Sequence, residues 1–285
     1  MIQKRVLLIH RDNDNYRNLT GWWSYPVPEF TWTSRRVKDG FKIDLTGTER
    51  DYDLVVLDDW IFGAIDNCNL PLAYVTVDSA RSDEQLRKNI EQSRHADVIL
   101  VDSDRLDKFT RRGSPVRRFA YAVNEHLYYP REKEYDVAFL CWPTPERRKI
   151  QSQCEWICKK YNWRFLSGTW SNYQDYARAI GSAKIVIHKS HVEQARSWRV
   201  FDVMASRGCL LTNPIPEVSG DMLETNKHYR VYNGEKSLER EICDLMDGEK
   251  WQEIAETGYN HVMANHVWSV RSKQLYDQLA EMFKW

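Results

Sequence analysis

Two adjacent arginines stand near the middle of the chain, at the start of an expected helix. Arg147 and Arg148 follow an apolar run at residues 137–140 and a turn rich in proline and threonine, within YDVAFLCWPTPERRK. Guanidinium groups bind phosphate oxygens in pairs of hydrogen bonds, and a helix N-terminus adds partial positive charge. The spacing therefore predicts contact with an anionic ligand. The alternative interpretation is a pair of arginines that are exposed to solvent and bind nothing.

Three more residues of the second half could serve the same ligand. Lys189 follows an apolar run at 185–187, and Arg199 precedes Asp202 on a helix expected at 198–207. A lysine or arginine at the end of a strand can reach phosphate oxygens. The alternative for Arg199 and Asp202 is an ion pair within one helix, because residues three apart share a face.

Candidate general bases stand in the first half, each after an expected strand. His10 ends the first strand, Asp58 and Asp59 follow the second, and Asp78 follows the third. A carboxylate or imidazole can take a proton from an attacking hydroxyl group. For Asp78 the alternative is a helix-capping role.

Metal and redox chemistry have weak support. The D-x-D pattern at Asp102 and Asp104 is also a metal signature, but capping of a following helix is favoured because a second α/β domain comes later. His188 and His191, in H-K-S-H, are interpreted as loop histidines. The sequence has neither G-x-G-x-x-G nor a P-loop motif, which disfavours dinucleotide and P-loop ATPase chemistry. We expect no metal site.

Alternating strands and helices must position these residues. Short, branched apolar runs favour buried parallel strands, and 3.6-residue stripes between them favour helices. The expected strands are residues 5–9, 54–57, 72–77, 98–101, 119–122, 137–140, 163–166, 184–187, 209–212 and 229–232. Two Rossmann-like, doubly wound α/β domains follow, at residues 1–127 and 128–268, with a C-terminal helix at 269–285 that packs back toward the first domain. Ligands of such sheets bind beyond the carboxyl ends of the strands, so the expected site is a cleft between facing domains.

Composition narrows the class of protein. The 285 residues are 42% hydrophobic, the formal net charge is zero, and no apolar run is long enough for a membrane span. The six cysteines form no C-x-x-C pair, and we interpret them as core thiols of a cytoplasmic protein. A locally basic segment suits either DNA or a solvated surface: Arg111, Arg112, Arg117 and Arg118.

The order of four stretches resembles the CgeB-like glycosyltransferases, a spore-maturation type family. They are ADVILVDSDRL with the following segment to Pro130, YDVAFLCWPTPERR, SWRVFDVMASRGCLLTNP, and residues 251–271. The resemblance implies the GT-B fold of two Rossmann-like domains. It places Arg199 near a donor diphosphate, Asp202 where the family has a ribose-binding glutamate, and Asp78 on the acceptor side. Gln194 replaces a second glutamate of retaining relatives.

The resemblance implies transfer of a sugar from a nucleotide-sugar, expected to be a UDP-sugar, to an acceptor hydroxyl without a metal or other cofactor. The donor would contact Arg147, Arg148, Lys189, Arg199 and Asp202. The acceptor is either a surface protein or polysaccharide, or a hydroxylated base in DNA held by the basic segment. Two alternatives stay open: a sugar-nucleotide epimerase of the same fold, and a non-catalytic nucleotide-sugar binding protein.

Overall fold

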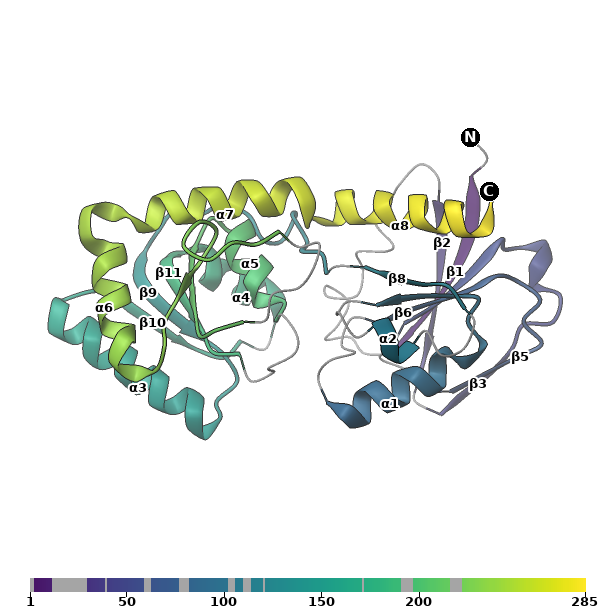
Figure 1. Ribbon diagram of the computed structural model, residues 1–285, viewed down its shortest axis with the longest axis horizontal. Helices are drawn as coiled ribbons and strands as arrows, with labels where there is room; N and C mark the ends of the chain where they lie inside the picture. Colours follow the sequence, from purple (N-terminus) through teal and green to yellow (C-terminus); the bar gives the residue numbers. More distant parts are fainter. Residues whose placement is uncertain are drawn as a thin grey trace. The chain divides into compact units, whose positions relative to one another are not determined.

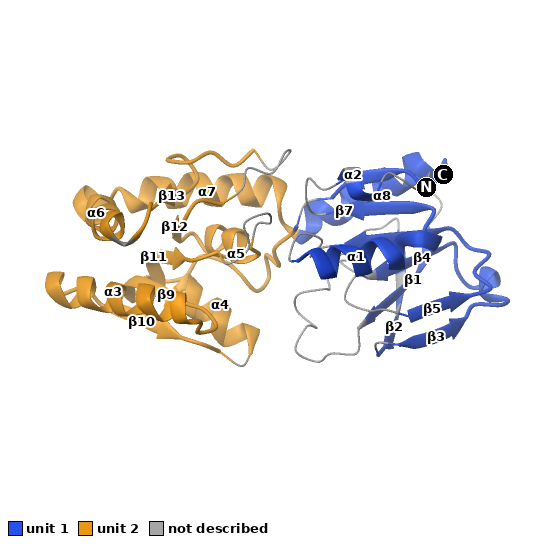
Figure 2. Ribbon diagram, turned by 60° about the horizontal axis from the view of Figure 1, so that its bottom comes forward, with its two compact units in different colours: residues 1–121, 218–220, 268–285 blue, residues 122–217, 221–267 orange. Residues whose placement is uncertain are grey.

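A computed structural model describes most of the chain as two compact units. It describes residues 3–11, 30–38, 40–58, 63–76, 82–101, 106–109, 114–119, 121–170, 172–190, 197–215 and 222–285. Unit 1 comprises residues 1–121, 218–220 and 268–285, and unit 2 comprises residues 122–217 and 221–267 (Figure 2). The boundaries expected from the sequence, after residues 127 and 268, stay predictions beside these units.

Unit 1 contains a parallel sheet of short apolar strands. Its order is β2-β1-β4-β6-β7-β8. The strands are β1 (Lys4–Arg11), β2 (Phe30–Val37), β4 (Leu54–Asp58), β6 (Leu72–Thr76), β7 (Val98–Val101) and β8 (Val116–Arg118). A separate parallel pair joins β3 (Phe41–Asp44) and β5 (Gly63–Asp66).

Three helices accompany the sheet of unit 1 (Figure 1): α1 (Asp83–Gln92), α2 (Leu106–Phe109) and α8 (Trp268–Phe283). Ser82 caps α1, because its side chain accepts a hydrogen bond from Gln85 N, as the sequence predicts. The final helix buries Leu275 and Leu279, and Tyr276 packs edge-on against Phe30 of β2 with ring centroids 5.1 Å apart. The C-terminal helix thus belongs to the unit that the N-terminus begins.

Unit 2 contains a second all-parallel sheet, with the order β10-β9-β11-β12-β13. The strands are β9 (Tyr135–Leu140), β10 (Phe165–Gly168), β11 (Ala183–His188), β12 (Cys209–Thr212) and β13 (Arg230–Val231). The helices are α3 (Pro145–Tyr161), α4 (Tyr173–Gly181), α5 (Arg199–Ala205), α6 (Glu235–Met246) and α7 (Trp251–Asn265). The first strand lies inside the sheet with its successors on both sides, which is a doubly wound arrangement.

The apolar stripe of α3 shows why this unit folds as it does. Ile150, Cys154 and Ile157 pack with Val137 and Phe139 of the sheet in one core, which α6 also enters. The other face of the sheet meets α4 and α5. Both faces are therefore covered, so the strands are apolar throughout rather than alternating.

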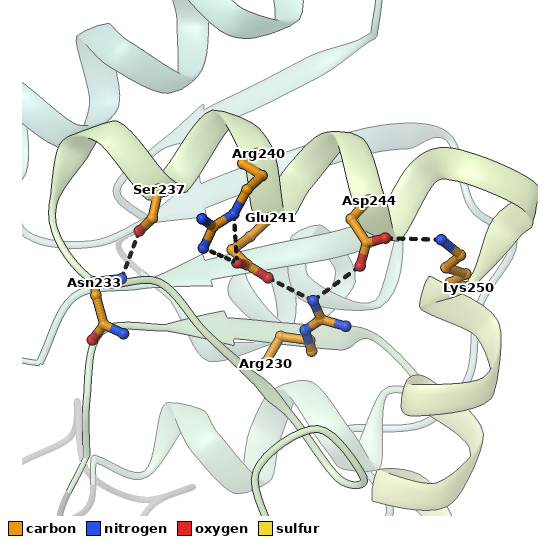
Figure 3. A network of polar contacts seen from close by, with 7 residues as sticks. All are labelled: Arg230, Asn233, Ser237, Arg240, Glu241, Asp244 and Lys250. Carbon is orange, nitrogen blue, oxygen red and sulfur yellow. Dashed lines mark hydrogen bonds and ion pairs between the residues drawn. The ribbon is translucent and has the colours of Figure 1, made fainter.

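A network of charged side chains fastens the edge strand β13 to α6 (Figure 3). Arg230 donates to Glu241 at 2.6 Å and to Asp244 at 2.9 Å, and Lys250 also donates to Asp244 at 2.8 Å. Glu241 is buried, so its charge needs these partners. The network therefore holds the edge strand β13 against α6.

Most expected strands are confirmed, with small shifts at their ends. The strand expected at 119–122 is wrong: the chain pairs earlier, as β8, and Phe119 and Tyr121 are not in a strand. The strands β2, β3 and β5 were not expected. A parallel α/β architecture is confirmed in both units. Among the described residues, no helix is both long enough and apolar enough to cross a membrane.

Candidate functional site

The sheet of unit 2 has a topological switch point between β9 and β11. The chain passes from β9 outward to β10, then returns to β11 on the other side. The connections after β9 and β11 consequently leave the sheet on opposite faces, and doubly wound sheets bind their ligands beyond such carboxyl ends. Residues 141–144 and 189–190 form these two loop starts.

Arg147 joins the two loops. Thr144 caps α3, with its hydroxyl oxygen accepting from Arg147 N at 3.3 Å, and Pro145 occupies the first turn. The Arg147 guanidinium donates to Lys189 O at 3.1 and 3.4 Å and to Trp142 O at 3.3 Å. The side chain is only 8% exposed, and this burial lowers the pKa of its guanidinium. Arg147 therefore holds the two loop starts together.

A second arginine forms a cluster with side chains from two other elements. Arg199, the first residue of α5, donates from Nε to the Tyr176 hydroxyl at 2.5 Å, and its Nη1 lies 3.1 Å from His188 Nδ1. Arginine can only donate, so His188 Nδ1 accepts and the neutral ring carries its proton on Nε2. His188 is the buried last residue of β11. The cluster thus fixes a cationic group beside the carboxyl end of β11.

Asp202 lies one turn beyond Arg199 on α5 and is 3% exposed. Burial raises the pKa of its carboxyl to about 8, although Arg199 and the neighbouring Tyr128 hydroxyl lower it. Among the described residues, its buried Oδ1 has no hydrogen-bond partner. Burial thus favours the protonated form of this carboxyl, and the ribose contact expected for it stays a prediction.

The other residues that were predicted to contact the nucleotide-sugar differ in exposure. Arg148 is exposed at the start of α3, and Lys189 is half-buried after β11. Neither has an ion-pair partner among the described residues. The next residue, Ser190, donates from its backbone N to Asn213 Oδ1 at 2.7 Å, which ties the loop after β11 to the loop after β12. These cations thus border a loop held by side-chain hydrogen bonds.

The first-half candidates are only partly described. His10 and Asp58 stand at neighbouring positions on β1 and β4, one residue beyond the paired Ile9 and Leu57. This is the switch point of the unit 1 sheet, but the Asp58 side chain lies outside what the structure describes. Asp78 and Asp59 also lie outside the described residues. All four catalytic candidates stay predictions.

The predicted acceptor arginines are likewise divided. Arg117 and Arg118 belong to β8, with Arg117 exposed. Arg118 O accepts from Gln278 Nε2 of α8 at 3.4 Å. Arg111 and Arg112, and the D-x-D segment at 102–104, lie outside the described residues. Within the part that the structure describes, no three His, Cys, Asp or Glu side chains group as metal ligands do.

Sequence reasoning missed the partners of Arg199. His188 was interpreted as a loop histidine, but it ends a strand and binds Arg199, so that interpretation is wrong. Its place directly after a buried apolar run was the available signal. Tyr176 was assigned only to the apolar stripe of its helix, and nothing in its local sequence indicates that its hydroxyl meets a residue of α5.

Comparison with known proteins gives a family and a set of structural neighbours. Residues 125–277, more than half of the chain, match the family described as "Glycosyl transferase-like". A comparison with curated proteins finds no match. Sucrose-phosphate synthase from Thermosynechococcus elongatus is similar in structure, with a TM-score of 0.64 and 12% identity, covering 99% of this chain and 100% of that one.

Two further neighbours were solved with nucleotide bound. Anabaena HepE in complex with UDP has a TM-score of 0.67 and 11% identity, covering 98% of this chain and 100% of that one. The pneumococcal O-GlcNAc transferase GtfA, in complex with UDP and GlcNAc, has a TM-score of 0.57 and 11% identity, covering 81% of this chain and 57% of that one. The neighbours are GT-B glycosyltransferases. At these identities the likeness shows the fold alone.

Proposed function

Because the chain belongs to the glycosyl transferase-like family and has the GT-B fold, we propose that it transfers a sugar from a UDP-sugar to an acceptor hydroxyl group. The expected fold and the expected enzyme class, a glycosyltransferase, are confirmed. The donor, the acceptor and the mechanism belong to the proposal. Structural neighbours solved with UDP-glucose or UDP support a nucleotide-sugar as co-substrate.

One observation carries the proposal for the donor. Arg199 stands at the carboxyl end of β11, held by His188 and Tyr176, beside the switch point of the unit 2 sheet. An arginine fixed by two side chains is preorganised, so little conformational entropy is lost when a phosphate binds to it. A switch point of this kind is where doubly wound sheets bind nucleotides.

The roles of the remaining cations follow from their contacts. Arg147 donates to loop carbonyls, so we assign it to positioning the loops around the diphosphate. Arg148 and Lys189 have no ion-pair partner among the described residues, and we assign them with Arg199 to the diphosphate itself. Positive charge there stabilises the leaving group as it develops, and the α3 N-terminus adds to it. The proposal therefore needs no metal.

The transfer itself breaks the bond between the anomeric carbon and the donor phosphate oxygen. The acceptor oxygen forms the new bond to that carbon, and its proton passes to a base. If the reaction inverts the anomeric centre, we assign the base to Asp78, with Asp58 and His10 as the other candidates. The diphosphate leaves with the electron pair of the broken bond.

Within the family, we propose that the chain belongs to the CgeB-like subtype. Both classes of acceptor expected from the sequence stay candidates. A surface protein or polysaccharide is the first candidate. A hydroxylated base in DNA is the second, supported by the exposed Arg117 and by the basic run around it. All six cysteines are free, which supports a cytoplasmic location because thiols stay reduced there.

The direct test is binding of UDP and UDP-sugars in the presence of EDTA, measured by titration calorimetry. We expect binding to the wild-type protein, and a loss of affinity of about tenfold or more in Arg199→Gln, because a charge-assisted contact is removed. Arg178→Gln changes an exposed arginine of the neighbouring helix α4 and should bind as the wild type does. Absence of binding to a well-folded wild-type protein overturns the donor assignment.

Product analysis then separates the classes. A transferase releases UDP and produces a new glycoside only when an acceptor is present, whereas an epimerase converts the sugar without an acceptor. A binding protein leaves the donor intact in both cases. For DNA, the affinity should fall steeply with salt because each phosphate contact releases counterions. Affinity for an acceptor that does not change with salt argues against DNA.

A further inference from the structure

A cavity of ≈ 520 Å³ lies in unit 2, separate from the arginine cluster described above. Its lining comes from residues 130–133 before β9, from Arg207 after α5, and from the first turns of α7. The chain segment before β9 and the segment after α5 both lie at the amino-terminal edge of the sheet, because they lead into β9 and β12. The arginine cluster stands at the opposite, carboxyl-terminal edge.

Lys133 marks the cavity as a place of excess positive charge. Its ammonium donates to Gly181 O at 2.9 Å and to Ser206 O at 3.2 Å, at the ends of α4 and α5. Helix C-termini favour a cation, but they supply only partial charge. No carboxylate pairs with Lys133 among the described residues, and desolvation, with the charge of Arg207, lowers the pKa of its ammonium to about 8.

Arg131 adds a second cation with unused hydrogen-bonding capacity. Its guanidinium carbon lies 4.0 Å from the centre of the Tyr129 ring, and its side chain crosses Gly181, where a Cβ would stand 2.8 Å from Arg131 Cδ. Its buried Nε has no hydrogen-bond partner within the described parts of the chain. No carboxylate there pairs with it either.

On the α7 side of the cavity, Trp251 is a third hydrogen-bond donor. Trp251 begins α7 and is 8% exposed, and its buried indole Nε1 also lacks an acceptor among the described residues. A buried donor without an acceptor is destabilising, so such donors are uncommon in folded proteins. Two of them beside one cavity indicate that an acceptor belongs there.

The cavity also has an excess of cations. Arg207 pairs with Glu256, at distances of 2.5 and 2.8 Å. Glu132 lines the cavity too, but it is exposed and pairs with neither Arg131 nor Lys133 among the described residues. We propose that this cavity binds an oxyanion, a phosphate or carboxylate group on a small organic molecule, which accepts hydrogen bonds from Arg131 and Trp251 and compensates the charge of Lys133. The cavity exceeds the size of an inorganic anion, and Pro130 and Ala255 offer apolar walls for an organic body.

Helix α5 connects this cavity with the arginine cluster. Arg199 begins the helix, and the carbonyl of Ser206, which caps its C-terminus, is bound by Lys133. The proposed site is independent of the proposed donor, and it is tested without a nucleotide.

The test uses inorganic phosphate and acetate as probes, each titrated at constant ionic strength with chloride as the balancing anion. Thermal unfolding gives the stabilisation, and the indole ¹H–¹⁵N signal of Trp251, assigned with Trp251→Phe, reports the site directly. We expect saturable stabilisation and a shift of this indole signal. The probe with the lower dissociation constant identifies the anionic group.

Variants then locate the binding. Arg131→Gln should raise the dissociation constant about tenfold or more, because one charge-assisted hydrogen bond is lost. Trp251→Phe keeps a ring and loses only the donor, so it should weaken binding even if Arg131→Gln folds poorly. Arg178→Gln, on the surface, should keep the wild-type affinity, read from the indole signal of Trp251. An unmoved indole signal, or equal loss of affinity in all variants, overturns the proposal.

Discussion

Replacing Asp202 by asparagine should change how the stability of the protein depends on pH. The carboxyl is buried beside Arg199, with a pKa of about 8 in the folded protein against an ordinary value of 3.8. Asparagine has nearly the same shape and no proton to lose. The variant therefore removes one titration and leaves the packing of α5 almost unchanged.

The sign and size follow from the two pKa values. Between pH 4 and pH 8 the folded protein keeps a proton that the unfolded chain has released. The stability that the protonated Asp202 carboxyl contributes is therefore fully present below its pKa in the unfolded chain. This contribution is lost as the pH rises toward its pKa in the folded protein. The free energy of unfolding falls by about 1.4 kcal/mol per pH unit, or about 3 kcal/mol from pH 5 to pH 7. Asp202→Asn should not show this fall.

Urea unfolding at pH 5, 6, 7 and 8 measures the effect, followed by tryptophan fluorescence and circular dichroism. The stability of Asp202→Asn minus that of the wild type should grow with pH at the slope given above. Asp247→Asn is the matched control, because Asp247 is exposed in the same unit, and its curve should run parallel to that of the wild type. A parallel curve for Asp202→Asn would refute the reasoning that Asp202 is protonated in the folded protein.

Three further predictions concern other parts of unit 2, and each is tested by urea unfolding. Arg147→Met should lose about 2–4 kcal/mol because it leaves two loop carbonyls without donors, whereas the exposed Arg148→Met should stay within about 0.5 kcal/mol of the wild type. Gly258→Ala should lose about 1–3 kcal/mol, since its Cβ would lie 2.7 Å from the backbone oxygen of His228; an unchanged stability would show that the turn before β13 moves away from α7 without cost. Burial raises the pKa of Asp136, but its partners, above all Lys184, lower it below its usual range, so the wild type should lose stability on acidification below pH 4 while Asp136→Asn loses less. Equal acid sensitivity of the two proteins would contradict that assignment.

The buried parallel strands could be predicted because both faces of each sheet are covered. Continuous apolar runs such as those of β7 and β11 have few other interpretations. The edge strand β2 was missed for the same physical reason: FTWTSRRV mixes polar and charged residues, as a strand with one open edge can. The expectation at 119–122 failed because apolar residues there are buried without being paired in the sheet.

Individual residues of the candidate site could be predicted, but the contacts between them could not. Arg199 and Asp202 lie on one helix at the expected spacing, but their contacts come from elements far away in the sequence. Tyr176 and His188 reach Arg199 from α4 and β11, and such a meeting depends on how the chain crosses the sheet. Arg147 is predicted to meet an anion, and that contact stays a prediction; its hydrogen bonds to loop carbonyls could not be predicted, because they depend on the positions of the loops.

The return of the chain to unit 1 affects the order in which the protein can fold during synthesis. Unit 2 consists almost wholly of residues 122–267, so its elements are all present before α8 emerges. The sheet of unit 1 is translated before unit 2, yet one of its helices, with Leu275 and Leu279 buried, is translated after unit 2. The sheet of unit 1 therefore stays partly uncovered until α8 has been made. Proteolysis within α8 would accordingly destabilise unit 1, to which this helix belongs, and leave unit 2 folded.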